Sequence, residues 1–115
     1  MKQKAYVAGV GMTPFGNAMD KTLNELACAS IKDALKDAGI AKEELNAAYM
    51  GNAAGAVITG QVCVPGQVAL RSMGISKIPV INVENACATS ATAFQQACTM
   101  VTLGVYDVVL VCGYE

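Results

Sequence analysis

The stretch that decides the fold is IPVINVENACATSATAF, residues 78–94. Its apolar, β-branched part predicts a buried strand at 80–83, and the small residues after it predict a helix. Cys87 falls between the two, at the first turn of that helix. Unpaired backbone N–H groups and the positive end of the helix dipole favour an anion there, so a thiol can ionise and act as a nucleophile near neutral pH.

Cys87 also has a second interpretation, because free cysteine is among the residue types most often buried as packing. The residues alone leave these two interpretations equal. A cysteine nucleophile normally needs a base, most often histidine, and the sequence contains none. Asn82 and Glu84 stay open between turn chemistry and positioning an active-site loop, whereas Asn85 is expected to serve the turn.

Strand and helix patterns alternate along the rest of the chain. The helix at 23–38 is the clearest, because Thr22 and Glu25 have capping-box spacing and Gly39 supplies a stop. Residues 55–66 are expected to form a loop. The expected strands are 5–10, 47–51, 80–83 and 105–112, and the other helices are 66–73 and 88–103. The predicted fold class is α/β, a layered, mostly parallel sheet with helices on both faces in the order βαβαβαβ.

Composition narrows the classes of function. The length of 115 residues fits one domain, and the net charge of −1 argues against nucleic acid as a partner. Only 15% of residues are charged, against about 25% in a typical domain, so we expect part of the surface to be covered by more chain or by a partner. No apolar run is long enough for a membrane span. The five cysteines lack metal-site spacing, so we expect no metal site and a reducing, cytoplasmic location.

Four segments together resemble a known family. They are residues 7–15 (VAGVGMTPF), Gly66-Gln67, residues 78–89 (IPVINVENACAT) and residues 109–115 (VLVCGYE). In this order they resemble the amino-terminal portion of thiolases of the sterol-carrier-protein type and of acetyl-CoA acetyltransferases. The nucleophile segment is the specific part of the match. A departure is Ser90, where the family often has glycine.

The resemblance implies an acyltransferase that cleaves 3-ketoacyl-CoA or condenses acyl-CoA through a cysteine acyl-enzyme, in lipid and fatty acid metabolism. The family's nucleophile maps onto Cys87, whose backbone N–H would also form part of an oxyanion hole. The substrates would be coenzyme A thioesters, with no bound cofactor; the residues that hold coenzyme A are unknown here. The family's histidine, its second cysteine and its coenzyme A loop lie downstream, and Cys112-Gly113 does not match the second cysteine motif.

Residues 1–115 are therefore expected to be an incomplete amino-terminal domain, inactive alone and lacking the loop region and the carboxyl-terminal half. The resemblance also implies a homodimer or larger homo-oligomer that meets near residues 78–83, with an accessory subunit as a further partner. The alternative reaction is that of another condensing enzyme of the same superfamily, similar to a ketoacyl synthase. A non-catalytic subunit that acts as an interaction module is the alternative class. In a eukaryote the location would be peroxisomal or mitochondrial.

Overall fold

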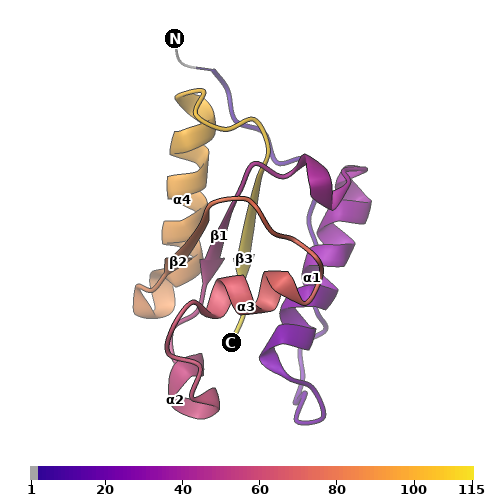
Figure 1. Ribbon diagram of the computed structural model, residues 1–115, viewed down its shortest axis with the longest axis vertical. Coiled ribbons are helices and arrows are strands. Elements are labelled where there is room, and N and C mark those ends of the chain that lie inside the picture. Colours follow the sequence, from indigo (N-terminus) through magenta and orange to yellow (C-terminus); the bar gives the residue numbers. More distant parts are fainter. Residues whose placement is uncertain (1–2) are drawn as a thin grey trace.

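The computed structural model describes residues 3–115. Its centre is one parallel sheet of three strands (Figure 1). The strand order is β2-β1-β3, and both pairs of neighbours run parallel. The elements in chain order are α1 (Leu23–Ala38), η1 (Lys42–Glu44), β1 (Ala47–Gly51), α2 (Gly55–Thr59), α3 (Pro65–Arg71), β2 (Val80–Val83), η2 (Ala86–Ala88), α4 (Thr89–Thr102) and β3 (Val109–Gly113).

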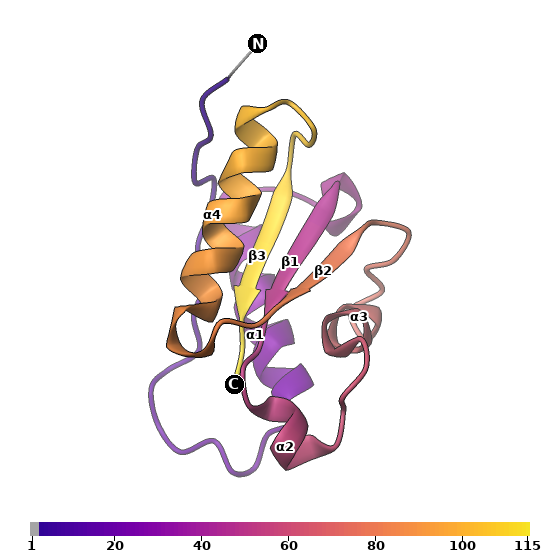
Figure 2. The same cartoon turned by 90° about the vertical axis from the view of Figure 1, so that its left-hand side faces the viewer.

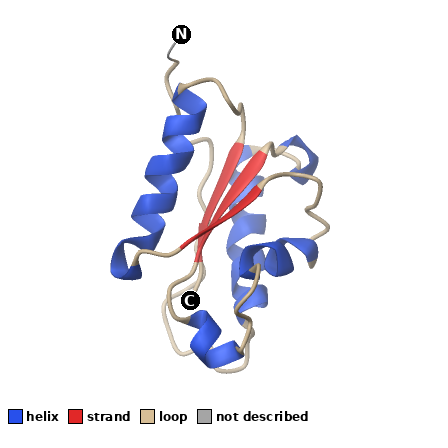
Figure 3. Ribbon diagram, turned by 60° about the vertical axis from the view of Figure 1, so that its left-hand side comes forward, coloured by secondary structure: helices blue, strands red, loops and turns tan. Residues whose placement is uncertain are grey.

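Helices cover both faces of this sheet. Helix α4 lies alone on one face, and α1 and α3 lie on the other (Figures 2 and 3). The alternation of side chains along β1 divides the core accordingly: Met50 joins the cluster under α1 and α3, whereas Tyr49 joins the cluster under α4. The predicted α/β class with helices on both faces is confirmed. Within residues 3–115, no helix combines the length and the apolar character that crossing a bilayer requires.

Most of the predicted elements are confirmed. The capping box of α1 forms as expected: Glu25 N–H donates to Thr22 Oγ1 at 3.1 Å, and Thr22 N–H donates to Glu25 Oε2 at 2.7 Å. Gly39 ends this helix with a φ of 66°, in the left-handed region that glycine adopts without strain. The helices predicted at 66–73 and 88–103 and the strands at 47–51 and 80–83 form within two residues of their predicted ends.

The fourth strand begins later than predicted. Residues 105–108 form an irregular, bent segment, and β3 starts at Val109. Asn46 Oδ1 accepts hydrogen bonds from the N–H groups of Asp107 and Val108, which holds this segment outside the sheet. The loop predicted at 55–66 was also partly wrong, since its first residues form α2. Asn52 Oδ1 accepts from the N–H of Gly55 at 2.9 Å and starts this short helix.

The strand predicted at 5–10 is wrong, so the sheet has three strands and not four. This segment is extended but lies against α1, where a Cβ on Gly9 would come within 2.5 Å of the Ala38 nitrogen. The N–H of Val10 donates to Asp37 Oδ2 at 2.8 Å, which fixes the segment to that helix. Gly9 permits the backbone of this segment to approach α1 closely. The pattern of apolar residues is the same for such a segment as for a strand, so it could not distinguish the two.

We expect the free energy of unfolding to decrease at alkaline pH because the thiol of Cys112 is buried. Burial raises the pKa of Cys112 from 9.0 to about 11, with a smaller raising effect from Cys28 and a lowering effect from the Ser30 hydroxyl. Between these values the unfolded state loses the proton and the folded state keeps it. The free energy of unfolding should therefore fall as pH rises from about 9 to 11, by up to about 1.4 kcal/mol per pH unit.

Urea unfolding of the full-length protein between pH 8 and pH 11 measures this slope. Cys112→Val removes the titrating group from the same buried position in β3, so the variant should lose this part of the slope. An equal slope in the wild type and in Cys112→Val would contradict the assignment.

Candidate active site

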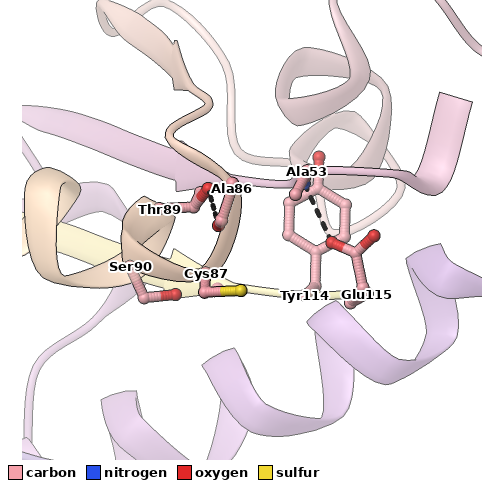
Figure 4. A pocket seen from close by; sticks show the side chains of 9 residues that line it. Ala53, Ala86, Cys87, Thr89, Ser90, Tyr114 and Glu115 are labelled. Carbon is pink, nitrogen blue, oxygen red and sulfur yellow. Dashed lines mark hydrogen bonds between the residues drawn. The ribbon is translucent and has the colours of Figure 1, made fainter.

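Cys87 lies at the carboxyl end of β2, where the chain turns into α4. The short helix η2 carries it and leads directly into α4, so the thiol sits immediately before the first turn of the long helix. The side chain is exposed, which contradicts the interpretation of Cys87 as buried packing. Figure 4 shows its sulfur pointing from the helix start toward Tyr114 and Glu115, across a hollow that all three residues line.

The backbone just before Cys87 is strained. Ala86 has a φ of 46°, a left-handed conformation that costs a residue with a Cβ about 1–2 kcal/mol. Asn85 is also in an unusual conformation, with φ −154° and ψ 47°. Glu84 Oε2 accepts from the Ala86 N–H at 2.5 Å, and the Ala88 N–H donates to the Asn85 carbonyl at 2.9 Å. The chain therefore reverses direction sharply and holds the next residue, Cys87, at the rim of the hollow.

Two glycines let the start of α4 lie against the sheet. A Cβ on Gly51, the last residue of β1, would come within 2.9 Å of Thr89 Cγ2. A Cβ on Gly113, the last residue of β3, would overlap Ser90 Oγ. Gly51 and Gly113 are register partners in the sheet. Ser90 is the residue that departs from the family resemblance. It fits beside β3 because Gly113 has no side chain.

A network of hydrogen bonds forms the opposite side of the hollow. Glu115 accepts from the N–H groups of Ala53 at 2.9 Å and Ala54 at 2.6 Å (the former drawn in Figure 4), and Asn52 Nδ2 donates to the Tyr114 carbonyl at 2.6 Å. The Tyr114 N–H donates to the Gly51 carbonyl at 3.0 Å. The segments that follow β1 and β3 are thereby tied together.

Tyr114 contributes a buried hydroxyl to this region. It has no hydrogen-bond partner among residues 3–115. Burial raises the pKa of Tyr114 to about 12, with smaller raising effects from Cys112 and Glu115. The hydroxyl therefore stays protonated at neutral pH and cannot act as a base there.

The polar groups around the hollow differ in how their hydrogen bonds are satisfied. The backbone N–H of Cys87 has no acceptor within the described part of the chain, so it can donate to an oxygen held near the thiol. Both carboxylate oxygens of Glu115 already accept backbone hydrogen bonds. No group of three or more potential metal ligands occurs among residues 3–115.

The other polar residues of the turn have local partners. Asn82 accepts from the Gly66 N–H and donates to Gln67, so it joins β2 to α3. Glu84 and Asn85 stabilise the turn itself, as Asn85 also donates to Thr92. Sequence reasoning missed the roles of Gly51, Gly113, Asn52, Thr89 and Glu115. The glycines that end β1 and β3 were the available signal, since glycine at a strand end often marks close approach of another segment.

The comparisons with known proteins agree on one family. The family model described as "Thiolase, N-terminal domain" matches residues 5–115. Sterol carrier protein 2 of Gallus gallus is 34% identical over 117 residues, which is 100% of this chain and 20% of that protein. Acetyl-CoA acetyltransferase of Methanocaldococcus jannaschii is 33% identical over 109 residues, which is 95% of this chain and 28% of that protein. The chain thus spans between a fifth and a third of the length of these relatives.

The solved structures support the fold. The crystal structure of 3-oxoacyl-[acyl-carrier-protein] synthase III from Aquifex aeolicus superposes with a TM-score of 0.71 at 22% sequence identity. The match covers 82% of this chain and 30% of that one. At this identity the likeness concerns the arrangement of strands and helices, and the reaction has to be argued from the site.

We expect Cys87 to be the most reactive of the five thiols in the folded full-length protein. Cys63 is the comparison, because it is the other exposed cysteine; it lies in the loop that precedes α3, outside the first turn of that helix. Iodoacetamide near neutral pH, followed by peptide mapping, should modify Cys87 about tenfold or more faster than Cys63, because the exposed Cys87 thiol lies at the rim of the hollow beside unpaired backbone N–H groups at a helix start. Labelling of Cys63 with Cys87 untouched would contradict this prediction.

Proposed function

The chain belongs to the thiolase family, as its amino-terminal domain, and we propose that it supplies the nucleophile of an acyltransferase acting on coenzyme A thioesters. The observation that supports this most directly is the placement of Cys87. Its exposed thiol stands on a strained turn at the carboxyl end of a parallel strand, beside a free backbone N–H. In open α/β sheets, sites are commonly built at this end of the strands.

The proposed reaction begins with attack of the Cys87 thiolate on an acyl carbonyl carbon. A carbon–sulfur bond forms, and the carbonyl oxygen becomes an oxyanion to which the Cys87 N–H donates. With 3-ketoacyl-CoA, the bond between C2 and C3 then breaks, and C2 takes the electron pair and a proton to give acetyl-CoA. The acyl group stays on Cys87 until the thiol of coenzyme A attacks it. Condensation of two acyl thioesters is the reverse sequence.

The hollow beside Cys87 fits only part of this substrate. Its volume is about 210 Å³, smaller than the roughly 300–1,000 Å³ of ordinary ligand pockets. We infer that it receives the reacting acyl group, while coenzyme A binds elsewhere in the full-length protein. The proton of the Cys87 thiol likewise needs a base from outside the described residues, since the sequence has no histidine.

Acyl-enzyme formation tests this function. The full-length protein, mixed with acetoacetyl-CoA and quenched in acid, should gain the mass of one acetyl group on the peptide that contains Cys87. Cys87→Ser should abolish this gain and lower turnover by at least about 10³-fold, because the hydroxyl is a far weaker nucleophile. Cys63→Ser is the matched control and should keep both. Acylation of another residue, or turnover that survives in Cys87→Ser, would refute the proposal.

We also propose that two copies of the protein pair through β2. This strand lies at the edge of the sheet, with β1 on one side only. Its residues Val80–Val83 include no charged side chain, although exposed edges of native sheets usually carry charges or are covered. Pairing across a two-fold axis would cover this edge in both copies and continue the sheet from one protomer into the next.

Light scattering of the full-length protein tests the dimer. Ile81→Asp should shift the mass from dimer to monomer, because it places a charge on the edge strand where it meets its symmetry mate. Ile81 is half-buried and packs near α4, so Ile81→Ala serves as the control that loses packing without adding charge. A monomeric wild type, or a dimer that is unaffected by Ile81→Asp, would count against this interface.

A further inference from the structure

Thr89, the first residue of α4, is buried, with 6% of its surface exposed. Its hydroxyl accepts from the N–H of Asn85 at 2.8 Å and donates to the carbonyl of Ala86 at 2.7 Å. Figure 4 shows the second of these bonds. The hydroxyl thus spans the two residues with unusual backbone conformations, directly before Cys87.

A buried hydroxyl persists only where it is paired, and Thr89 uses its donor and an acceptor site on the same turn. The left-handed conformation of Ala86 also needs support from its surroundings, because a residue with a Cβ does not adopt it freely. Glu84 holds the N–H of Ala86 from one side, and Thr89 holds its carbonyl from the other. The conformation of Ala86 sets the direction in which the chain presents Cys87.

The methyl group and the hydroxyl of Thr89 have separate tasks. Thr89 Cγ2 is the atom that a Cβ on Gly51 would approach within 2.9 Å, so the methyl group packs on the end of β1. The hydroxyl instead bonds the turn. Substitutions can remove one group and keep the other, which separates packing from positioning.

We propose that Thr89 is a positioning residue: its hydroxyl fixes the turn at Asn85–Ala86 and thereby aims the thiol and the N–H of Cys87 at the substrate carbonyl. This inference rests on the proposed function of Cys87 as the nucleophile. Thr89 is proposed to act through the backbone of the turn that carries Cys87.

The test is the pH profile of Cys87 alkylation by iodoacetamide in the full-length protein. Thr89→Val keeps the shape and the methyl group but loses both hydrogen bonds of the hydroxyl, so the alkylation rate should fall roughly tenfold across the measured pH range. Thr89→Ser keeps the hydroxyl and loses the methyl group, so it should retain the wild-type profile even where its melting temperature is lower. Thr99→Val makes the same change farther along α4 and should leave the profile unaltered.

Reactivity and stability should therefore rank the Thr89 variants differently. A Thr89→Val protein that reacts like the wild type, or a Thr89→Ser protein as slow as Thr89→Val, would overturn the inference. If Thr89→Val does not fold, Thr89→Ala replaces it, because Ala and Ser differ at this position in the hydroxyl alone. The acyl-enzyme experiment on Cys87 is separate: its failure would refute the proposed function, whereas a normal profile in Thr89→Val would refute only the positioning role.

Discussion

The start of α4 can rest on the ends of β1 and β3 because Gly51 and Gly113 have no side chains there. A Cβ on Gly51 would come within 2.9 Å of Thr89 Cγ2 and a Cβ on Gly113 would overlap Ser90 Oγ, so the side chain concerned would have to shift. This close approach places the strained turn, the helix start and the segments after both strands around one hollow. The candidate site is thus a consequence of backbone packing, and Cys87 is the residue that the packing presents.

Local patterns were sufficient to predict the elements that carry the site. The β-branched run at Val80–Val83 and the small residues after Cys87 have the periods of a buried strand and a helix, and both form where expected. The capping box at Thr22 and the stop at Gly39 are also local, since each depends on residues within one helical turn. Cys87 could be placed before a helix for the same reason.

Contacts between distant residues account for what the sequence did not reveal. The segment at residues 5–10 has the composition of a strand, but its partner is α1, some thirty residues away in the chain. The bonds from Glu115 to Ala53 and Ala54 join positions more than sixty residues apart. The hydroxyl of Thr89 has an ordinary position in the sequence. Its importance depends on the unusual conformation of Ala86, which residue types alone do not specify.

The register of the sheet limits where residues can be inserted into this chain or deleted from it. Val83, Gly51 and Gly113 lie side by side across the three strands, at the row where the turn and the hollow begin. Inserting or deleting one residue within β1 or β3 would move a larger side chain under the start of α4 and would exchange the two faces of that strand. A change of length in the loops between these elements would leave this row of residues in place.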